Sequence, residues 1–477
     1  MSARAPVRGP ASGAGAAPGA LEALRWLVAV VGVAAAVVLG GGAAHGDPPA
    51  DDAARLVPAD ALVYVHLSTD GDRDATKAAG AMADRFPSWP SLRDGIVRQL
   101  SAPGCRVTDA MFRDADEVAL ALFDVSGGTT ANSLVLVDTG SDHAQADEHR
   151  CGTLSAAYVG RFLAIGQPES LDVAQRLARG DGDALADAAA PQRELARLPE
   201  DRVADGWVSQ DGVRRLLAPQ GGLLGAAGVL LDQPALEGAA FGLTAEGGDR
   251  ARLTVASQLD PAVARRNTAG FEPFSPSLAG DVPASAMAYL GVSNIAPALQ
   301  RLVAAAGSSS EGVQALTDQL APVLERVFRG EAAVILTPHA PAPILTLLTR
   351  TSDEAASRRA LAGLPAALRG KLSSAVFDGK VAVSTSEDGI RAVQDGGERL
   401  TDTDHWRKAV GNLPDRVSSL LFLDFSRLLT LGEQTGLDES PSYRAAKADL
   451  AKVQAIGAHT SGNDQESTAE ISLLISS

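Results

Sequence analysis

Two short stretches of the sequence decide how the rest of the chain is read. Val57–Ser68 (VPADALVYVHLS) recurs as Val282–Ser293 (VPASAMAYLGVS), and six of the twelve positions are identical. Three further pairs of segments match in the same order, at an offset that drifts from 225 to 215 residues: 158–164 with 377–383, 198–203 with 413–417, and 242–247 with 457–462. Four matches in register indicate an internal duplication. We therefore predict two homologous tandem repeats, 55–260 and 281–477, joined by a linker at 261–280.

Each predicted repeat mixes short strands with helices. Ala61–Leu67 is rich in β-branched and aromatic residues and is bounded by turn signals, as is typical of a buried strand. Ala75–Phe86 has the apolar spacing of a helix. Two apolar runs, 118–125 and 133–139, flank a Ser-Gly-Gly turn, and two later pairs of runs, 240–244 with 252–259 and 455–459 with 469–475, indicate hairpins.

The turns within these hairpins and the starts of the helices after them have their own sequence signals. Asp378-Gly379 is a dipeptide favoured in two-residue hairpins, because both positions need positive φ. Ser170 and Ser386 stand where a helix N-cap is expected. Hairpins interrupted by helices predict an α+β fold, in which an antiparallel sheet is packed by helices and covered on one face.

The N-terminal region predicts a membrane anchor. Residues 26–44 carry no charge, and nineteen helical residues span roughly 28 Å, close to the thickness of a bilayer core. Arginines precede the run and aspartates follow it, which predicts that the N-terminus lies in the cytoplasm and the rest of the chain outside it. We therefore expect a disordered cytoplasmic tail at 1–25, the transmembrane helix at 26–44 and a linker to the extracytoplasmic part at 45–54. The alternative is a secreted protein whose signal peptide is cleaved after the small residues Gly42-Ala43-Ala44.

Charge and cysteine content narrow the classes of partner. The 58 acidic and 42 basic residues give a net charge of −16. An acidic surface repels phosphate backbones, which argues against nucleic-acid binding. Two cysteines, Cys105 and Cys151, in an oxidising compartment predict a disulfide, with a reactive thiol as the alternative.

The chain resembles a known family in three places: the opening LVPADALVYVHLS, the block TDTDHWRKAVGNLPDRVSSLLFLDFSRLL near the C-terminus, and the N-terminal anchor. The family consists of actinobacterial, membrane-anchored proteins that carry a domain-of-unknown-function label. The resemblance implies a single-pass envelope protein and supplies no activity, cofactor or site residue. His66 departs from the pattern, because it occupies a strand position that reads as apolar.

Motifs for catalysis and for metal or cofactor binding are missing or incomplete. The sequence lacks G-x-S-x-G and the phosphate-binding G-x-x-x-x-G-K-[ST]. A calcium loop is suggested by the spacing of Asp70, Asp72 and Asp74, but its glycine and glutamate are missing. A zinc site is suggested by the residue types of His143, Asp147, His149 and Cys151, but their spacing is poor. We therefore assign no catalytic, cofactor or metal residues, and interpret the shared pairs Asp201-Arg202 and Asp415-Arg416 as structural.

These observations favour a non-enzymatic binding or scaffold module of the cell envelope. Its expected partners are the membrane, through the N-terminal helix, and an envelope protein or lipid. Such a module predicts a groove between the two repeats or an apolar surface within the glycine-rich stretch 216–231, formed by Leu223, Leu224, Val229, Leu230 and Leu231. The alternatives are a hydrolase of cell-wall or glycan substrates, which needs two carboxylates or a nucleophile with a base in a cleft, and a structural spacer without a pocket.

Overall fold

The computed structural model describes residues 48–476 apart from 92–93, 95–114, 126–131, 144–147, 218–234, 265–271, 295–326, 328–329, 341 and 365–370. The described chain is α+β, as predicted: strands pair antiparallel throughout and helices pack against them. Within these residues no helix is both long enough and apolar enough to cross a bilayer. The predicted anchor at 26–44 lies outside the described residues.

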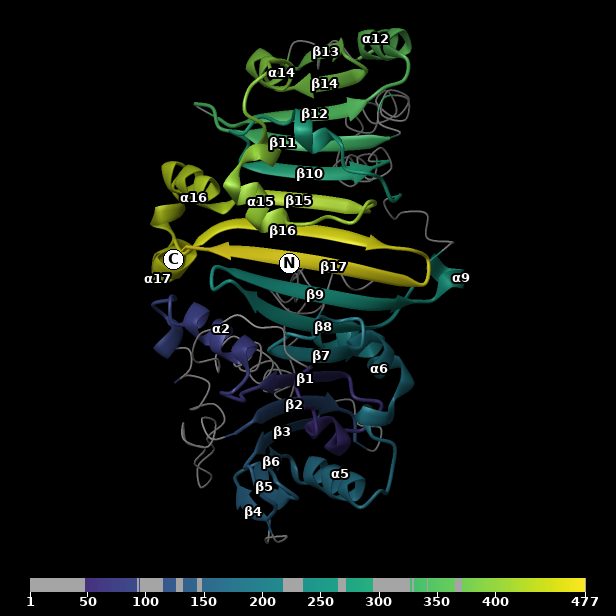
Figure 1. Cartoon of the computed structure of the whole chain (residues 1–477), viewed down its shortest axis with the longest axis vertical. Coiled ribbons are helices and arrows are strands. Elements are labelled where there is room, and N and C mark those ends of the chain that lie inside the picture. Colours follow the sequence, from purple (N-terminus) through teal and green to yellow (C-terminus); the bar gives the residue numbers. More distant parts are fainter. Residues whose placement is uncertain are drawn as a thin grey trace, which may run out of the picture.

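Seventeen described strands form a single sheet that runs the length of the molecule (Figure 1). Its spatial order is β4-β5-β6-β3-β2-β1-β7-β8-β9-β17-β16-β15-β10-β11-β12-β14-β13. Each half ends in a hairpin, β8–β9 in the first and β16–β17 in the second, which we call the closing hairpins. Their last strands, β9 and β17, lie side by side in the middle of the sheet. They pair over nine residues, from Glu466 opposite Gln258 to Leu474 opposite Arg250. The junction between the halves is therefore a hydrogen-bonded ladder rather than a flexible hinge.

The strands of the first half are β1 (Val63–Ser68), β2 (Glu117–Phe123), β3 (Asn132–Asp138), β4 (His149–Cys151), β5 (Leu154–Val159), β6 (Phe162–Gly166), β7 (Ala204–Ser209), β8 (Leu236–Glu246) and β9 (Arg250–Leu259). Its helices and helical turns are η1 (Ala53–Leu56), α2 (Asp74–Ala83), α5 (Pro168–Ala178), η2 (Leu185–Asp187), α6 (Ala189–Leu195), α7 (Gln210–Gly212), η3 (Val213–Leu217) and α9 (Pro261–Ala264).

The strands of the second half are β10 (Ala288–Ser293), β11 (Glu331–Thr337), β12 (Ile344–Arg350), β13 (Ser373–Phe377), β14 (Lys380–Ser384), β15 (Ser419–Asp424), β16 (Val453–Gly462) and β17 (Glu466–Ile475). Its helices and helical turns are η4 (Leu278–Asp281), α12 (Glu354–Ala362), α14 (Glu387–Gln394), η5 (Leu400–Asp402), α15 (Asp404–Val410), α16 (Phe425–Gln434), η6 (Leu437–Glu439) and α17 (Pro441–Leu450).

The two halves have the same strand order except for the short β4. In the first half β1 lies between β2 and β7, and in the second half β10 lies between β11 and β15. Tyr64 of β1 faces Trp207 of β7, and Tyr289 of β10 faces Phe422 of β15, so the register is also the same. This correspondence assigns to each residue of these paired strands a counterpart in the other half.

Helices cover both faces of the central strands in the first half, which corrects the expectation of one covered face. Every residue of β1 and β2 is buried. On one face α2 packs against an apolar cluster that includes Val65, Leu120 and Trp89, and on the other η1, α5 and α6 pack against a cluster that includes Tyr64 and Trp207. Strands buried on both faces lose the alternation of polar and apolar residues, which explains why β1 reads as a continuous apolar run.

Local signals at turns and helix starts had mixed outcomes. The predicted hairpin at Asp378-Gly379 is confirmed, because both residues have positive φ, 44° and 67°. Ser386 caps α14 by accepting from the Asp388 N–H. The prediction for Ser170 was wrong, because α5 begins at Pro168 and Gln167 occupies its N-cap. Proline favours the first turn of a helix, since its missing N–H is not needed there.

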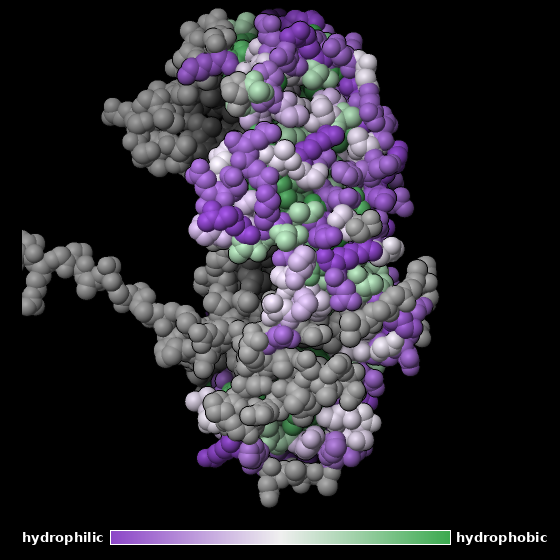
Figure 2. Space-filling model, turned by 90° about the vertical axis from the view of Figure 1, so that its left-hand side faces the viewer, coloured by the Kyte–Doolittle hydropathy of each residue, from purple (hydrophilic) through white to green (hydrophobic). Residues whose placement is uncertain are grey.

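The described surface on the side that carries the ends of α2, α16 and α17 is mostly hydrophilic (Figure 2). Hydrophobic residues are exposed there in small groups. The predicted apolar surface at 223–231 lies outside the described residues, as does Cys105, so the disulfide with Cys151 stays a prediction.

Candidate functional sites

A cavity lies where the two halves meet, on the face of the sheet that carries α2. We call it the junction cavity, and its volume is about 300 Å³. The first half lines it with α2, β8 and β9 and the second half with β17 and α17; the residues are Ala79, Met82, Ala83, Phe86, Ser88, Trp89, Leu243, Thr244, Ala245, Ala251, Asp449, Leu473 and Ile475. The binding hypothesis expects a groove at this place.

The sheet pairing explains why the junction cavity is apolar. Leu473 of β17 lies opposite Ala251 of β9, and Ile471 lies opposite Leu253. Alternate residues of a strand share one face, so these four side chains form an apolar strip on the face of the sheet that carries the cavity. Ile471 is 40% exposed, which is unusual for a large apolar residue of a central strand. The apolar lining therefore continues from the cavity onto the accessible surface.

Polar contacts close the rim of the junction cavity across the two halves. The Ser88 N–H donates to Asp449 Oδ1 at 3.0 Å, and Arg85 donates to the carbonyl oxygen of Ser476 at 3.4 Å. The rim is thus polar and the interior apolar, an arrangement that suits a ligand with an apolar chain.

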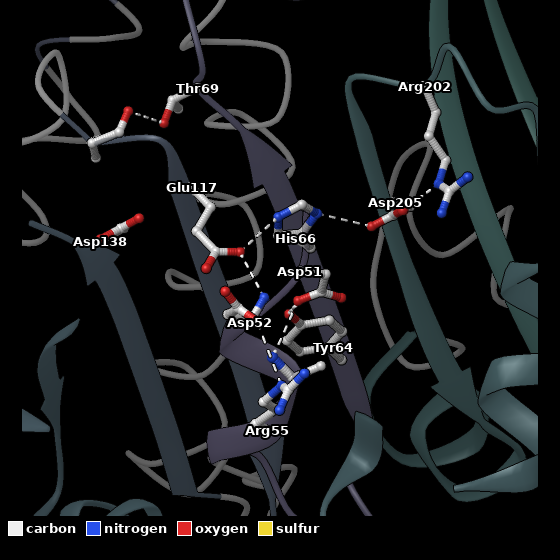
Figure 3. A network of polar contacts seen from close by, with 12 residues as sticks. Asp51, Asp52, Arg55, Tyr64, His66, Thr69, Glu117, Asp138, Arg202 and Asp205 are labelled. Carbon is white, nitrogen blue, oxygen red and sulfur yellow. Dashed lines mark hydrogen bonds and ion pairs between the residues drawn. The ribbon is translucent and has the colours of Figure 1, made fainter. Parts of the chain in front are cut away.

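A second candidate site is a group of buried polar side chains on the opposite face of β1, which we call the His66 cluster: Asp51, Tyr64, His66, Glu117 and Asp205 (Figure 3). His66 is fully buried, and its two ring nitrogens contact carboxylates on opposite sides. Nδ1 lies 3.0 Å from Asp205 Oδ1, and Nε2 lies 3.2 Å from Glu117 Oε2. Asp51 accepts a hydrogen bond from the Tyr64 hydroxyl and caps η1 by accepting from the Ala54 N–H.

Arginines support the outer side of this cluster. Arg202 donates to Asp205 Oδ2 and to the carbonyl oxygen of Pro199. Arg161 lies 3.2 Å from Glu117 Oε1 and 2.9 Å from Asp138 Oδ2. The Asp201-Arg202 pair that we interpreted as a structural unit is therefore split, because Arg202 pairs with Asp205. Arg416, from the matching Asp415-Arg416 pair of the second half, donates to the Pro273 carbonyl.

The charges in the cluster shift each other's protonation. Burial alone lowers the pKa of His66, but the charge of Asp51 and the contacts with Asp205 and Glu117 outweigh burial and raise this pKa well above its usual value. Burial raises the pKa of Asp51, assisted by the neighbouring carboxylates. Burial also acts to raise the pKa of Asp205, yet His66 and Arg202 together lower it. These contacts favour the protonated form of His66 between Asp205 and Glu117.

The second half shows which parts of the cluster the fold requires. The counterpart of Glu117 is Glu331, which accepts from the N–H groups of Ser277 and Leu278 at 2.6 and 2.8 Å and so caps η4. Glu117 does the same for η1 by accepting from the Asp52 N–H at 3.2 Å. This glutamate is therefore a structural cap in both halves.

Tyr64 is retained as Tyr289 in the second half, whereas the other three members are replaced. By register, the counterparts of His66 and Asp205 are Gly291 and Leu420, and Pro276 stands where Asp51 does relative to η1. Because the same strands pair without these three residues, the fold does not need them. Sequence reasoning missed the cluster; its one available signal was His66 at an apolar strand position.

The residues that the sequence singled out for metal chemistry are not assembled. His143 stacks on Tyr158 and contacts Thr139 Oγ1 at 2.9 Å, while His149 lies on β4 and Asp147 lies outside the described residues. Asp70 accepts from the Asp72 N–H in the turn before α2. In the second half, His405 contacts Asp424 at 3.3 Å at the start of α15. None of these sets brings three ligating side chains together in the described structure.

Comparisons with known proteins give little. No family model and no curated protein matches the chain. A solved structure described as "Structure of crystal form I of TP0453" matches at 12% identity and a TM-score of 0.25, over 44% of this chain and 79% of that one. A likeness at this level indicates nothing about function.

Proposed function

We propose that this protein is a membrane-anchored binding module of the cell envelope, and that it holds a lipid acyl chain in the junction cavity. The observation that carries the proposal is the cavity itself, about 300 Å³ in volume and lined mainly by apolar side chains from both halves. Ligand pockets start at roughly this size and are mostly apolar with a few polar groups at fixed places.

The shape of the apolar lining favours a chain rather than a compact ligand. The strip formed by Ala251, Leu253, Ile471 and Leu473 leads out of the cavity to the exposed Ile471. Each methylene group that leaves water along such a strip contributes about 0.8 kcal/mol. An acyl chain gains from the whole length of the strip, whereas a small polar ligand gains nothing there.

The proposed anchor and the duplicated architecture support this role. A helix at 26–44 with its N-terminus in the cytoplasm would place the described residues outside the cell, within a short linker of the outer membrane leaflet. We propose that the two halves are tandem repeats, on the basis of their matched segments and identical register. The cavity forms where the closing hairpins of the two repeats pair, so a single repeat would lack it.

The hydrolase alternative has less support. The His66–Asp205 pair resembles the base of a hydrolase, but His66 is fully buried and lies on the face opposite the cavity. A general base must reach the proton that it removes. A substrate in the cavity cannot meet this histidine.

Lipid binding can be tested on the full chain purified from native membranes in a mild detergent. Mass spectrometry of the extracted lipids identifies what is retained, and titration with a fluorescent long-chain fatty acid measures affinity. The diagnostic variant is Ala79→Trp, which places a large side chain into the cavity from α2. The matched control is Leu345→Trp, because Leu345 is an exposed residue of β12 far from the cavity (47% exposed).

We expect the wild type and the control to bind the fatty acid equally, and Ala79→Trp to bind at least tenfold more weakly while unfolding at the same denaturant concentration. Equal binding by all three proteins, or no lipid above the level of an unrelated membrane protein, would show that the junction cavity is not a lipid site.

A further inference from the structure

We propose that the His66 cluster binds one divalent transition-metal ion through Asp51, Nδ1 of His66 and Asp205. One ligand atom from each of these side chains lies within 4.8 Å of the others. In the part of the chain that the structure describes, no other three histidine, cysteine or acidic side chains are so placed. The inference is independent of lipid binding, because the cluster and the junction cavity lie on opposite faces of the sheet.

The donor set suits a metal of borderline hardness. One imidazole nitrogen and two carboxylate oxygens are ligands that zinc accepts, and three protein ligands leave a position open for water. Manganese and iron accept the same donors, but zinc binds more tightly at a site of this kind. Zn²⁺ is therefore the probe of choice.

Each proposed ligand already has a partner that would orient it. Tyr64 donates to Asp51, and Arg202 donates to the oxygen of Asp205 that does not face His66. Glu117 lies 3.2 Å from Nε2, the ring nitrogen that would carry the proton if Nδ1 bound the metal (Figure 3). A ligating histidine almost always donates its other N–H to a carboxylate or carbonyl in this way, and that contact fixes the tautomer.

A further observation points to a ligand rather than to a structural ion pair. The second half folds with Pro276, Gly291 and Leu420 at the three ligand positions, so the fold does not need polar side chains there.

Nδ1 binds a cation through its lone pair, so His66 would ligate as the neutral imidazole and any proton on Nδ1 would leave to solvent. The bound cation would give the buried carboxylates a positive partner, which avoids the penalty of an uncompensated buried charge. Asp51, which is partly buried and precedes η1, gives the ion a route from solvent, whereas His66 and Asp205 are buried.

The test is calorimetric titration of Zn²⁺ into the full metal-free chain in detergent. The first variant is Asp51→Asn, which removes a ligand at the edge of the fold. The second is Glu117→Gln, which weakens the orientation of His66. The control is His405→Gln, because His405 forms a histidine–aspartate contact in the second half without a third ligand.

We expect one Zn²⁺ per chain in the wild type and the control. Loss of an outer partner weakens metal sites about 10–100-fold, so Glu117→Gln should fall in this range and Asp51→Asn should lose more. X-ray absorption of the wild-type zinc complex should show nitrogen and oxygen neighbours only, a readout that does not depend on whether a variant folds. Absence of a one-to-one site, unchanged affinity in a folded Asp51→Asn variant, or sulfur neighbours from the cysteines would overturn the proposal.

Discussion

The two equivalent tyrosines, Tyr64 and Tyr289, should respond in opposite ways to loss of their hydroxyl groups. Both side chains are fully buried at the same place in their half of the sheet. The Tyr64 hydroxyl donates to the carboxylate of Asp51, whereas the Tyr289 hydroxyl is buried without a hydrogen-bond partner. Tyr289 instead lies over Gly291, where an added Cβ would come within 2.5 Å of its hydroxyl oxygen. The same residue type therefore has a satisfied polar group in one half and an unsatisfied one in the other.

The expected magnitudes follow from the energetics of these two hydroxyls. A hydrogen bond to a charged group contributes about 1.5–3 kcal/mol, so Tyr64→Phe should lower the free energy of unfolding by about 2 kcal/mol. An unsatisfied buried hydroxyl costs about 1–3 kcal/mol, so Tyr289→Phe should raise the free energy of unfolding by about 1 kcal/mol. The ring packing of Tyr289 on Trp406, with centroids 5.5 Å apart, is unchanged in the phenylalanine variant.

Urea unfolding of the full chain, followed by tryptophan fluorescence, measures both effects. Trp207 and Trp406 report on the two halves, since each lies in the same apolar cluster as one of the tyrosines. The midpoint should fall for Tyr64→Phe and rise for Tyr289→Phe at an unchanged m value. If Tyr289→Phe destabilises the protein, or if both variants shift the midpoint in the same direction, the assignment of partnered and unpartnered hydroxyls is wrong.

Three further predictions concern the junction and its helices. Gly457→Ala should lower the free energy of unfolding in urea by about 1–3 kcal/mol, because the added Cβ would lie 2.2 Å from the backbone oxygen of Ala409. Gly71→Ala is the control: Gly71 has open space around it, so the free energy of unfolding should change little. Arg197→Met removes the hydrogen bond to Thr468 Oγ1 across the junction and leaves the buried Glu194 unpaired. Hydrogen exchange of the amides along the β9–β17 ladder should therefore become faster. A second substitution, Glu194→Gln, should reverse part of this effect because it removes the unpaired buried charge. Burial lowers the pKa of His459, so below the unfolded-state pKa of about 6.5 the unfolded state binds more protons than the folded state. The wild type should therefore lose stability relative to His459→Gln between pH 7 and 5. An equal pH dependence of stability in the two proteins would contradict this.

Local physics accounts for the parts of the fold that the sequence predicted. The strand at Ala61–Leu67, the helix at Ala75–Phe86 and the turn at Asp378-Gly379 follow from composition, periodicity and backbone φ preference, and the structure has β1, α2 and the β13–β14 hairpin at these places. The cap expected at Ser170 failed because a competing local signal, Pro168 at the first helical position, was stronger.

The candidate sites could not be predicted in the same way. The ligand positions of the His66 cluster come from the segment before η1, from β1 and from β7, and Asp51 and Asp205 are 154 positions apart in the chain. The sequence around a carboxylate does not show which residue it will contact. Only the pairing of β1 with β7 identifies Asp205 as the residue beside His66. The residues His143, His149 and Cys151 drew attention because they are close in sequence, yet the structure places His143 against Tyr158.

The α+β class, the main hairpins and the similarity of the two halves can be predicted from the order of residues along the chain. These features depend on residues a few positions apart or on direct repetition, both of which can be read along the chain. The pairing of β9 with β17, which joins seventeen described strands into one sheet, is apparent only in the folded chain. Backbone hydrogen bonds between strands do not depend on side-chain identity, so no residue pattern predicts that pairing. The junction cavity and the His66 cluster both follow from such long-range pairing.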